Sequence, residues 1–204
     1  NFSTLTSAEL QTQAADTINS VRSIITDLIK PQTERTVANT FEPYNEALIL
    51  LTNLMGVSNV LENTHPKKEL RETAEKVSQD LIALATELSL NPVLYEAINA
   101  VDVSTENSAT QWLKTKMVKD FQRSGVDRDD ETRTKIQRLQ ENFIKLKQTF
   151  ERNILEDRRS IKITTGELAG LPDDYIRNHP ADTYGLVTIT TDYSDYRPFM
   201  TYAD

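Results

Sequence analysis

The sequence predicts a mainly α-helical protein, in which an antiparallel body of about six helices with a long spine helix is followed by a small β element near the C-terminus. Glycine and proline are scarce, with 5 Gly and 7 Pro in 204 residues, so the elements should be long. Apolar residues recur at spacings of three and four through most of residues 6–159. After residue 160 the apolar period changes to two, and β-branched residues become frequent.

Three helices should come first. The first begins at Thr6, because Thr6 and Glu9 have the spacing of a capping box, and it ends before Pro31. A polar loop leads to a second helix over about residues 43–61. The third covers about residues 66–88, with a proline in its first turn, where no helical amide hydrogen bond is lost. Each has one apolar face, as expected for helices that share a core.

Two shorter helices follow. Asn91 can cap a helix over about residues 92–101, which has a proline just inside its first turn. A fifth helix begins near Ser108 and ends at Gly125, a residue suited to the left-handed conformation of a common C-cap. Its apolar side chains are expected to be buried: Trp112, Leu113, Met117 and Phe121.

The sixth helix is predicted to be the longest. Asp127 or Asp129 can cap it, and further acidic residues in its first turn suit the positive end of the helix dipole. About 30 residues at roughly 1.5 Å each make a rod of roughly 45 Å, which predicts a spine that crosses a larger body. Its apolar residues follow a regular spacing: Ile136, Leu139, Phe143, Leu146, Phe150 and Ile154.

The segment after residue 160 has a different character. Ile161 and Ile163 alternate with polar residues, which indicates a strand, and residues 185–193 form the clearest second strand. Between them, a helical turn and a Gly-Leu-Pro break precede a short helix. The last residues, 196–204, are expected to be extended. The chain is therefore divided into a helical N-terminal domain and a turn and β segment: residues 1–160 and residues 161–204.

Composition excludes several classes of function. The chain has no cysteine, which rules out disulfides, thiolate nucleophiles and thiolate metal sites. Its net charge is −8, and the basic residues of segment 114–160 are interleaved with acidic ones in a helical pattern typical of a solvated face. Nucleic acid is therefore not expected as a partner. No apolar run approaches the ~20 residues of a membrane span, so no membrane partner is expected.

The two histidines do not predict a metal site. His65 and Glu69 have the spacing of side chains on one helical face, but His65 precedes a proline at the start of the helix. Two ligands are also too few for a closed zinc site. His179 has the same Asn and Pro neighbours, and both histidines are interpreted as solvated loop side chains. The chain contains no His-Glu-x-x-His pair, which would place two imidazoles and a general base on one helical face.

Acidic groups are the next candidates. Asp129-Asp130-Glu131 and Asp173-Asp174 could be considered as acid/base pairs. Adjacent acids at a helix start point in different directions, however, so helix capping explains both groups better.

The remaining candidates are also explained by structure. Gly166 and Gly170 are too far apart for a dinucleotide-binding loop, and no Gly-Lys-Ser or Gly-Lys-Thr follows them. Ser124 before Gly125 lacks the frame of a nucleophile elbow. A group of tyrosines could line a peptide groove, although packing against the strands is the favoured interpretation: Tyr175, Tyr184, Tyr193, Tyr196 and Tyr202.

Several longer segments occur in a particular order. They are "NTFEPYNEAL" from Asn39, "PKKELRETAEKVSQDLIALATELSLNPVLYEAI", "MVKDFQRSGVDRDDETRTKIQRLQENFIKLKQTFERNILED" and "ELAGLPDDYI". Together they resemble the N-terminal region of the thimet oligopeptidase, neurolysin and oligopeptidase A family of zinc metallopeptidases. The first helix contributes less to the resemblance.

The resemblance implies a two-lobed, mostly helical peptidase with a deep narrow channel. Its zinc is held by a His-Glu-x-x-His helix and a later glutamate, and activates water for the hydrolysis of short peptides. None of those positions exists in this chain, so no catalytic, cofactor-binding or metal-binding residue is assigned to it. We expect an N-terminal, channel-wall part of such an enzyme, inactive alone. Its partners would be short peptides and its own absent catalytic domain, toward which residues 161–204 lead.

A helical adaptor or scaffold domain, binding a protein partner through its long helix, is the alternative from another class. The β segment distinguishes the two, because an adaptor does not need it. A cytoplasmic location is favoured by the resemblance. A chain that begins with Asn1 instead of Met leaves a processed or periplasmic form open.

Overall fold

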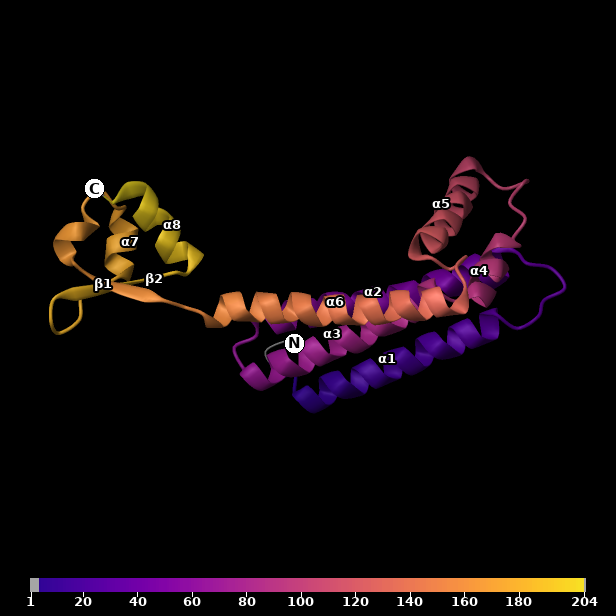
Figure 1. Ribbon diagram of the computed structural model, residues 1–204, viewed down its shortest axis with the longest axis horizontal. Helices are drawn as coiled ribbons and strands as arrows, with labels where there is room; N and C mark the ends of the chain where they lie inside the picture. Colours follow the sequence, from indigo (N-terminus) through magenta and orange to yellow (C-terminus); the bar gives the residue numbers. More distant parts are fainter. Residues whose placement is uncertain (1–3, 204) are drawn as a thin grey trace. The chain divides into compact units, whose positions relative to one another are not determined.

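The computed structural model describes residues 4–203, without the side chains at positions 155 and 156 (Figure 1). Within that range, eight α-helices and two strands follow one another along the chain. The predicted fold class, mainly helical with a small β element near the C-terminus, is confirmed. The chain divides into two compact units, Asn1–Leu146 and Lys147–Asp204.

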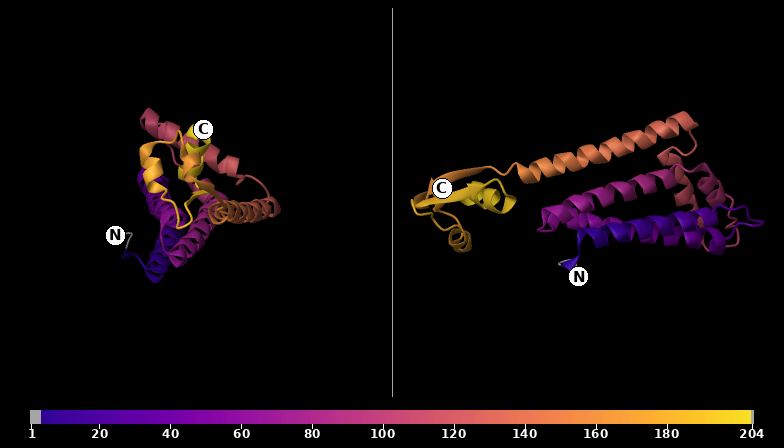
Figure 2. Two further views of the ribbon diagram at one scale, coloured as in Figure 1. Left: turned by 90° about the vertical axis from the view of Figure 1, so that its left-hand side faces the viewer. Right: turned by 90° about the horizontal axis from the view of Figure 1, so that it is seen from below.

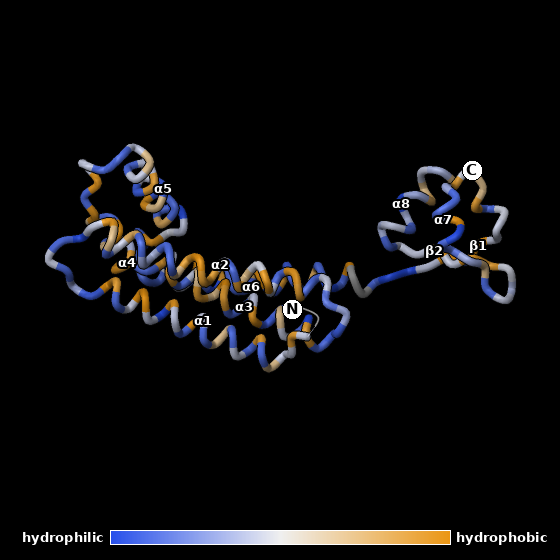
Figure 3. The backbone as a smooth tube through the Cα atoms, turned by 180° about the vertical axis from the view of Figure 1, so that it is seen from behind, coloured by the Kyte–Doolittle hydropathy of each residue, from blue (hydrophilic) through white to orange (hydrophobic). Residues whose placement is uncertain are grey.

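The core of the first unit is built by three consecutive helices: α1 (Ser7–Leu28), α2 (Glu42–Thr64) and α3 (Lys68–Ser89). They lie side by side, and each contacts the other two (Figures 1 and 2). Leu10, Leu51 and Leu81 are among the large side chains fully buried in this unit. Figure 3 shows hydrophobic positions recurring along these helices, as a shared core requires.

Both ends of α1 have specific stabilising contacts. The Glu9 amide donates to Oγ1 of Thr6 at 3.2 Å, and the Thr6 amide donates to the Glu9 carboxylate at 2.8 Å, which confirms the predicted capping box. At the other end, the Arg35 guanidinium donates to the carbonyls of Leu28 and Lys30. The bond to Leu28 satisfies a carbonyl at the end of the helix that has no partner within it.

The loop after α1 ends in a π-helical turn, η2 (Val37–Phe41), which the sequence pattern did not predict. Thr36 and Asn39 form a second capping box there, with the Thr36 amide donating to Oδ1 of Asn39 at 2.9 Å and the Asn39 amide donating to Oγ1 of Thr36 at 3.2 Å. The turn runs directly into α2 and places Phe41 in the core.

Two shorter helices begin where the sequence predicts: α4 (Pro92–Asn99) and α5 (Ser108–Ser124). Oδ1 of Asn91 accepts hydrogen bonds from the first free amides of α4, as a capping asparagine should. Gly125 ends α5 with φ at 96°, which confirms the left-handed C-cap.

The predicted burial of the apolar residues of α5 is wrong for its first half. Phe121 is 3% exposed and Met117 is partly buried, but Trp112 is 64% exposed and Leu113 is 41% exposed. Apolar spacing defines a face of a helix without defining what covers it. Here a cavity lies beside α5, and Leu113 lines it.

The longest described helix is α6 (Asp130–Glu156). Oδ1 of Asp129 accepts a hydrogen bond from the Thr132 amide at 2.8 Å, so Asp129 is the cap that the sequence offered as one of two choices. The regular apolar series of this helix lies mostly on its surface. Ile136 is partly exposed, and the others are more than half exposed: Leu139, Phe143, Leu146, Phe150 and Ile154.

The second unit is organised by two antiparallel strands, β1 (Ser160–Thr164) and β2 (Leu186–Thr190). Ile163 of β1 lies opposite Val187 of β2, and both side chains are buried. A short 3-10 turn, η3 (Thr165–Leu168), and the short helix α7 (Asp173–Asn178) connect the strands, as predicted.

The prediction that residues 196–204 are extended is wrong for residues 196–202, because α8 (Tyr193–Tyr202) is a helix. Ala203 has an extended backbone, and residue 204 lies outside the described residues. The Asp192 carbonyl accepts hydrogen bonds from the amides of Asp195 and Tyr196, at 2.9 Å and 2.7 Å, and starts the helix. Pro198 lies inside it and weighs against helix on propensity alone. Phe199 packs against the small core of this unit, and this tertiary contact outweighs the local preference.

Candidate functional site

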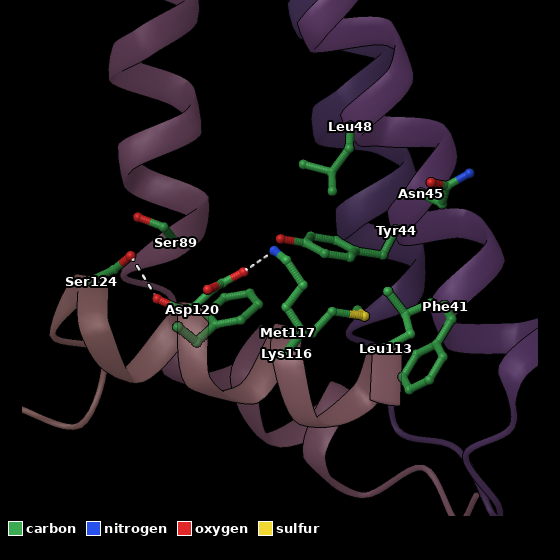
Figure 4. Close-up of a pocket in the computed structure, with 11 residues that line it drawn as sticks. Phe41, Tyr44, Asn45, Leu48, Ser89, Leu113, Lys116, Met117, Asp120 and Ser124 are labelled. Atoms are coloured by element: carbon green, nitrogen blue, oxygen red, sulfur yellow. Dashed lines mark hydrogen bonds and ion pairs between the residues drawn. The ribbon is translucent and has the colours of Figure 1, made fainter. Parts of the chain in front are cut away.

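A cavity of about 270 Å³ lies between α2 and α5, beside the end of α3 (Figure 4). Its walls are mostly apolar side chains of α2 and α5, together with Phe41 of η2. The lining residues are Phe41, Tyr44, Asn45, Leu48, Ser89, Leu113, Lys116, Met117, Asp120, Phe121 and Ser124.

Aromatic packing fixes one wall of this cavity. The ring centroid of Phe121 lies 5.9 Å from that of Tyr44 and 6.0 Å from that of Tyr95, both in tilted arrangements. The position of Phe121 follows from the local sequence, because the Asn107 cap and Gly125 set the two ends of α5. The wall is therefore held by contacts between α2, α4 and α5.

The polar groups of the cavity interact with one another. Nζ of Lys116 lies 2.5 Å from Oδ2 of Asp120, and this hydrogen bond lowers the pKa of the Asp120 carboxyl. Burial raises the pKa of Tyr44 to about 12, and the negative charge of Asp120 adds to the effect. Ser124 donates to the Asp120 carbonyl at 3.0 Å. The cavity can accept an apolar group with a polar end, and its lining contains no imidazole that could act as a base near neutral pH.

The interpretation of His65 as a solvated loop side chain is wrong, because this residue is 7% exposed. It ends α2, where its Nδ1 accepts a hydrogen bond from the Lys67 amide at 3.2 Å and its carbonyl accepts one from Arg71 at 2.8 Å. Glu69, its proposed neighbour on one helical face, is exposed in the first turn of α3. The structure thus gives His65 a structural role at a helix end.

His179 is also not a solvated side chain, because its ring is 15% exposed and stacks on Tyr175 at a centroid distance of 4.1 Å. Its Nε2 lies 3.1 Å from Oδ1 of Asp195, and its Nδ1 lies 2.8 Å from the Tyr175 carbonyl. The second carboxylate oxygen of Asp195 accepts a hydrogen bond from the Thr190 hydroxyl at 2.5 Å. The cluster links α7, β2 and α8 within the second unit.

Both acidic groups lie at helix starts, but the predicted capping is found only at α6. Asp129 caps α6, and Asp130 forms an ion pair with Arg133 in its first turn. Asp173 and Asp174 are exposed in the first turn of α7, where a negative charge suits the helix dipole. Neither group forms a pair of carboxylates facing each other across a cleft.

The tyrosines do not line one groove. Of the five considered, Tyr175 alone is buried in the small core, and the other four are at least half exposed: Tyr184, Tyr193, Tyr196 and Tyr202. Packing against the strands is therefore the role of Tyr175 alone. Gly166 lies in η3, and Gly170 adopts φ at 86° in the turn before α7.

The described residues contain no group of three or more His, Asp or Glu side chains placed to hold a metal ion. Among the described helices, none by itself is long and apolar enough to cross a membrane; α3 and α4 reach that measure as a pair, but they are bent by 57°.

The first unit is a bundle of consecutive helices with a mostly apolar cavity between α2 and α5. The sequence model of the neurolysin/thimet oligopeptidase N-terminal domain matches residues 14–133. The chain belongs to this family of oligopeptidases.

Relatives agree with this assignment. A thimet-like oligopeptidase of Dictyostelium discoideum is 26% identical over 84% of this chain and 27% of its own length. Organellar oligopeptidase A of Arabidopsis thaliana is 26% identical over 86% of this chain and 24% of its own length. Saccharolysin of Saccharomyces cerevisiae is 22% identical over 96% of this chain and 29% of its own length. The chain therefore spans about a quarter of the length of these relatives.

Sequence reasoning missed the cavity itself. Its two walls contain parts of two segments that carry the family resemblance, the one that begins at Asn39 and the one around Phe121. The apolar series of α5 is the signal that could have indicated the cavity. Trp112 and Phe121 lie on opposite sides of this helix, so a single neighbouring helix cannot bury both side chains. Nothing in the spacing, however, indicates that α2 is the opposite wall.

Proposed function

We propose that this chain is the N-terminal, channel-wall part of a zinc metallo-oligopeptidase that hydrolyses short peptides. The family match over residues 14–133 carries the proposal. The lengths of the relatives support it, since this chain matches only about a quarter of proteins named oligopeptidases. In the intact protein, the helical first unit would form part of the wall that limits access to short, unfolded peptides.

Zinc would be held outside this chain. The two histidines are both engaged in structural contacts, His65 at the end of α2 and His179 with Asp195. The described residues offer no third ligand beside either of them, so these residues do not fit a zinc ion. The chemistry would belong to a catalytic domain that follows residues 161–204, and the chain alone is expected to be inactive.

Incubation of the purified chain with zinc and a fluorogenic peptide tests this proposal. We expect no metal-dependent hydrolysis by the chain alone, and hydrolysis that a chelator abolishes by the intact protein from the same gene. Metal-dependent turnover by the chain alone would contradict the assignment of the chemistry to another domain.

The coding sequence after Asp204 provides a second test. We expect the downstream codons to encode a His-Glu-x-x-His motif. A stop codon would instead favour the helical adaptor. We further propose a cytoplasmic protein with no nucleic-acid or membrane partner. Immunodetection of the native protein in fractionated cells checks the location, and enrichment in an organelle would overturn it.

A further inference from the structure

The helix α6 is oriented with its polar side toward the other helices of the first unit. Glu141, Ile144 and Lys145 line a cavity of about 180 Å³ together with residues of α3. Nearer its start, Arg133, Thr134 and Gln137 line a second hollow with Leu90 and Asn91. Five of these six α6 side chains are polar or charged.

The apolar side of α6 points away from these contacts. At about 3.6 residues per turn, Leu139 and Phe143 lie on the side of the helix opposite Glu141 and Lys145. Leu139 is 57% exposed, Phe143 is 61% exposed and Leu146 is 69% exposed. Phe150 and Ile154 continue the series along the same helix, and we call these five residues the α6 stripe.

The size of the α6 stripe indicates a contact surface. Five large apolar side chains, each more than half exposed, present on the order of 500 Å² of apolar surface. A soluble protein that exposes a continuous patch of this size commonly uses it for binding. An amphipathic helix that turns its polar side to its own bundle lacks the burial that normally stabilises such a helix.

The residues beside the α6 stripe argue against a second copy of this chain as the occupant. Two-stranded coiled coils favour β-branched residues alternating with leucine along the seam, and charged residues on both borders. The stripe instead alternates leucine with two phenylalanines, Phe143 and Phe150. Its borders are largely uncharged, with Gln140, Asn142 and Thr149 beside Lys147.

The lengths of the relatives suggest an occupant for this surface. They have about three quarters of their length outside the region that matches this chain. We propose that the α6 stripe is the surface on which this remaining part of the polypeptide packs, through an apolar face of its own. This inference rests on the proposed function, because it requires a longer protein of the same family.

Hydroxyl-radical footprinting tests the surface directly. In the 204-residue chain, Phe143 and Leu146 should be modified readily, while the buried Leu81 is protected. In the intact protein, we expect Phe143 and Leu146 to lose most of their modification. Equal modification in the two forms would overturn the proposal.

A pair of substitutions provides the matched control. Phe143→Lys changes the α6 stripe, and Val60→Lys makes the same change at a 51% exposed position of α2. In the intact protein, we expect Phe143→Lys to lower the thermal midpoint and Val60→Lys to leave it nearly unchanged. In the 204-residue chain, neither substitution should change the thermal midpoint much. A dimer of the 204-residue chain that Phe143→Lys dissociates, with no effect on the intact protein, would assign the stripe to a second copy instead.

Peptide hydrolysis separates this proposal from the proposed function. Protection of Phe143 in an intact protein that hydrolyses no peptide would support the surface and reject the enzymatic role. Hydrolysis by an intact protein in which Phe143 stays reactive would support the enzymatic role and reject the surface.

Discussion

Nε2 of His179 lies 3.1 Å from Oδ1 of Asp195, while Nδ1 of the same ring lies 2.8 Å from the Tyr175 carbonyl oxygen. Both neighbours are acceptors, so the ring satisfies both contacts only when both of its nitrogens carry hydrogen. The pair joins the end of α7 to the first turn of α8, and it holds together a unit whose core is small.

The second unit should lose stability in acid through Asp195. Burial by itself raises the pKa of this carboxyl, but hydrogen bonds from Thr190 and His179 outweigh burial and hold the pKa below its ordinary value of 3.8. A carboxyl whose pKa is lower in the folded state stabilises the fold above its unfolded pKa, and loses that contribution as the pH falls through its folded value. The protection factors of the β2 amides, which correct exchange rates for the pH dependence of intrinsic exchange, should therefore fall between about pH 5 and about pH 2.

Asp195→Asn provides the contrast. This variant should be less stable than the parent at neutral pH. Its stability should also fall less than that of the parent as the pH is lowered. Asp174→Asn, at an exposed position in α7, should keep the acid dependence of the parent. An Asp195→Asn variant with the same acid profile as the parent would assign that profile to other groups.

The first unit should lose stability in alkali through Tyr44. Burial raises the pKa of this phenol to about 12, so the unfolded chain, with its ordinary pKa of 10.0, releases the proton first. The contribution is present below about pH 10 and is lost as the pH rises toward 12, with a size of about 3 kcal/mol. Denaturant midpoints of the parent and of Tyr44→Phe should diverge over this range.

Tyr184→Phe is the matched control, because Tyr184 is 86% exposed and should leave the alkaline profile unchanged. Asp120→Asn should lower the pKa of Tyr44, since the Asp120 charge contributes to raising it. An ultraviolet titration in which Tyr44 ionises together with the exposed tyrosines would contradict the buried position.

Substitution of glycine by alanine should change the free energy of unfolding in opposite directions at two positions. Gly125 adopts φ at 96° and a Cβ there would lie 2.6 Å from Cδ1 of Ile136, so Gly125→Ala should destabilise the chain by about 1–2 kcal/mol. Gly56 lies within α2 with open space where a Cβ would be placed, so Gly56→Ala should stabilise the chain by about 0.5–1 kcal/mol. Chemical denaturation measures both, and equal effects would contradict the assigned cap.

Two leucines should differ strongly when they are truncated. Leu81 is fully buried in α3, so Leu81→Ala should lower the free energy of unfolding by about 2–5 kcal/mol. Leu139 is 57% exposed, so Leu139→Ala should change it by less than about 0.5 kcal/mol in the isolated chain. A large loss at Leu139 would show that α6 is packed differently in solution.

The helical part of the fold could be predicted from the sequence because its signals are local. The Thr6–Glu9 capping box, the Asn91 cap and Gly125 each act within four residues, and each is found where predicted. The α8 helix could not be predicted in this way. Its stability depends on Phe199 packing against the small core of the second unit, which includes Ile163 of β1 and Tyr175 of α7, while Pro198 gives the opposite local signal.

The same distinction between local signals and contacts with other elements applies to the candidate site. The capping role of Asp129 depends on neighbours along one helix, and the sequence pattern predicts it. The capping predicted for Asp173 and Asp174 is not found, because Pro172 occupies the cap position of α7. The surroundings of His65 and His179 depend on where other elements place their carbonyls, amides and carboxylates, so both were assigned to solvent and both are in fact mostly buried. The cavity between α2 and α5 brings together residues about 70 positions apart, beyond the reach of any periodic pattern.

The order of α1, α2 and α3 has a consequence for biosynthesis. Helices that are consecutive and adjacent make contacts between residues close in sequence, and such topologies fold in microseconds to milliseconds. A ribosome adds about 5–20 residues per second, so this core can form soon after Ser89 has emerged. The helix α6 would then join a bundle that is already folded. Its apolar side would remain available to chain synthesised later.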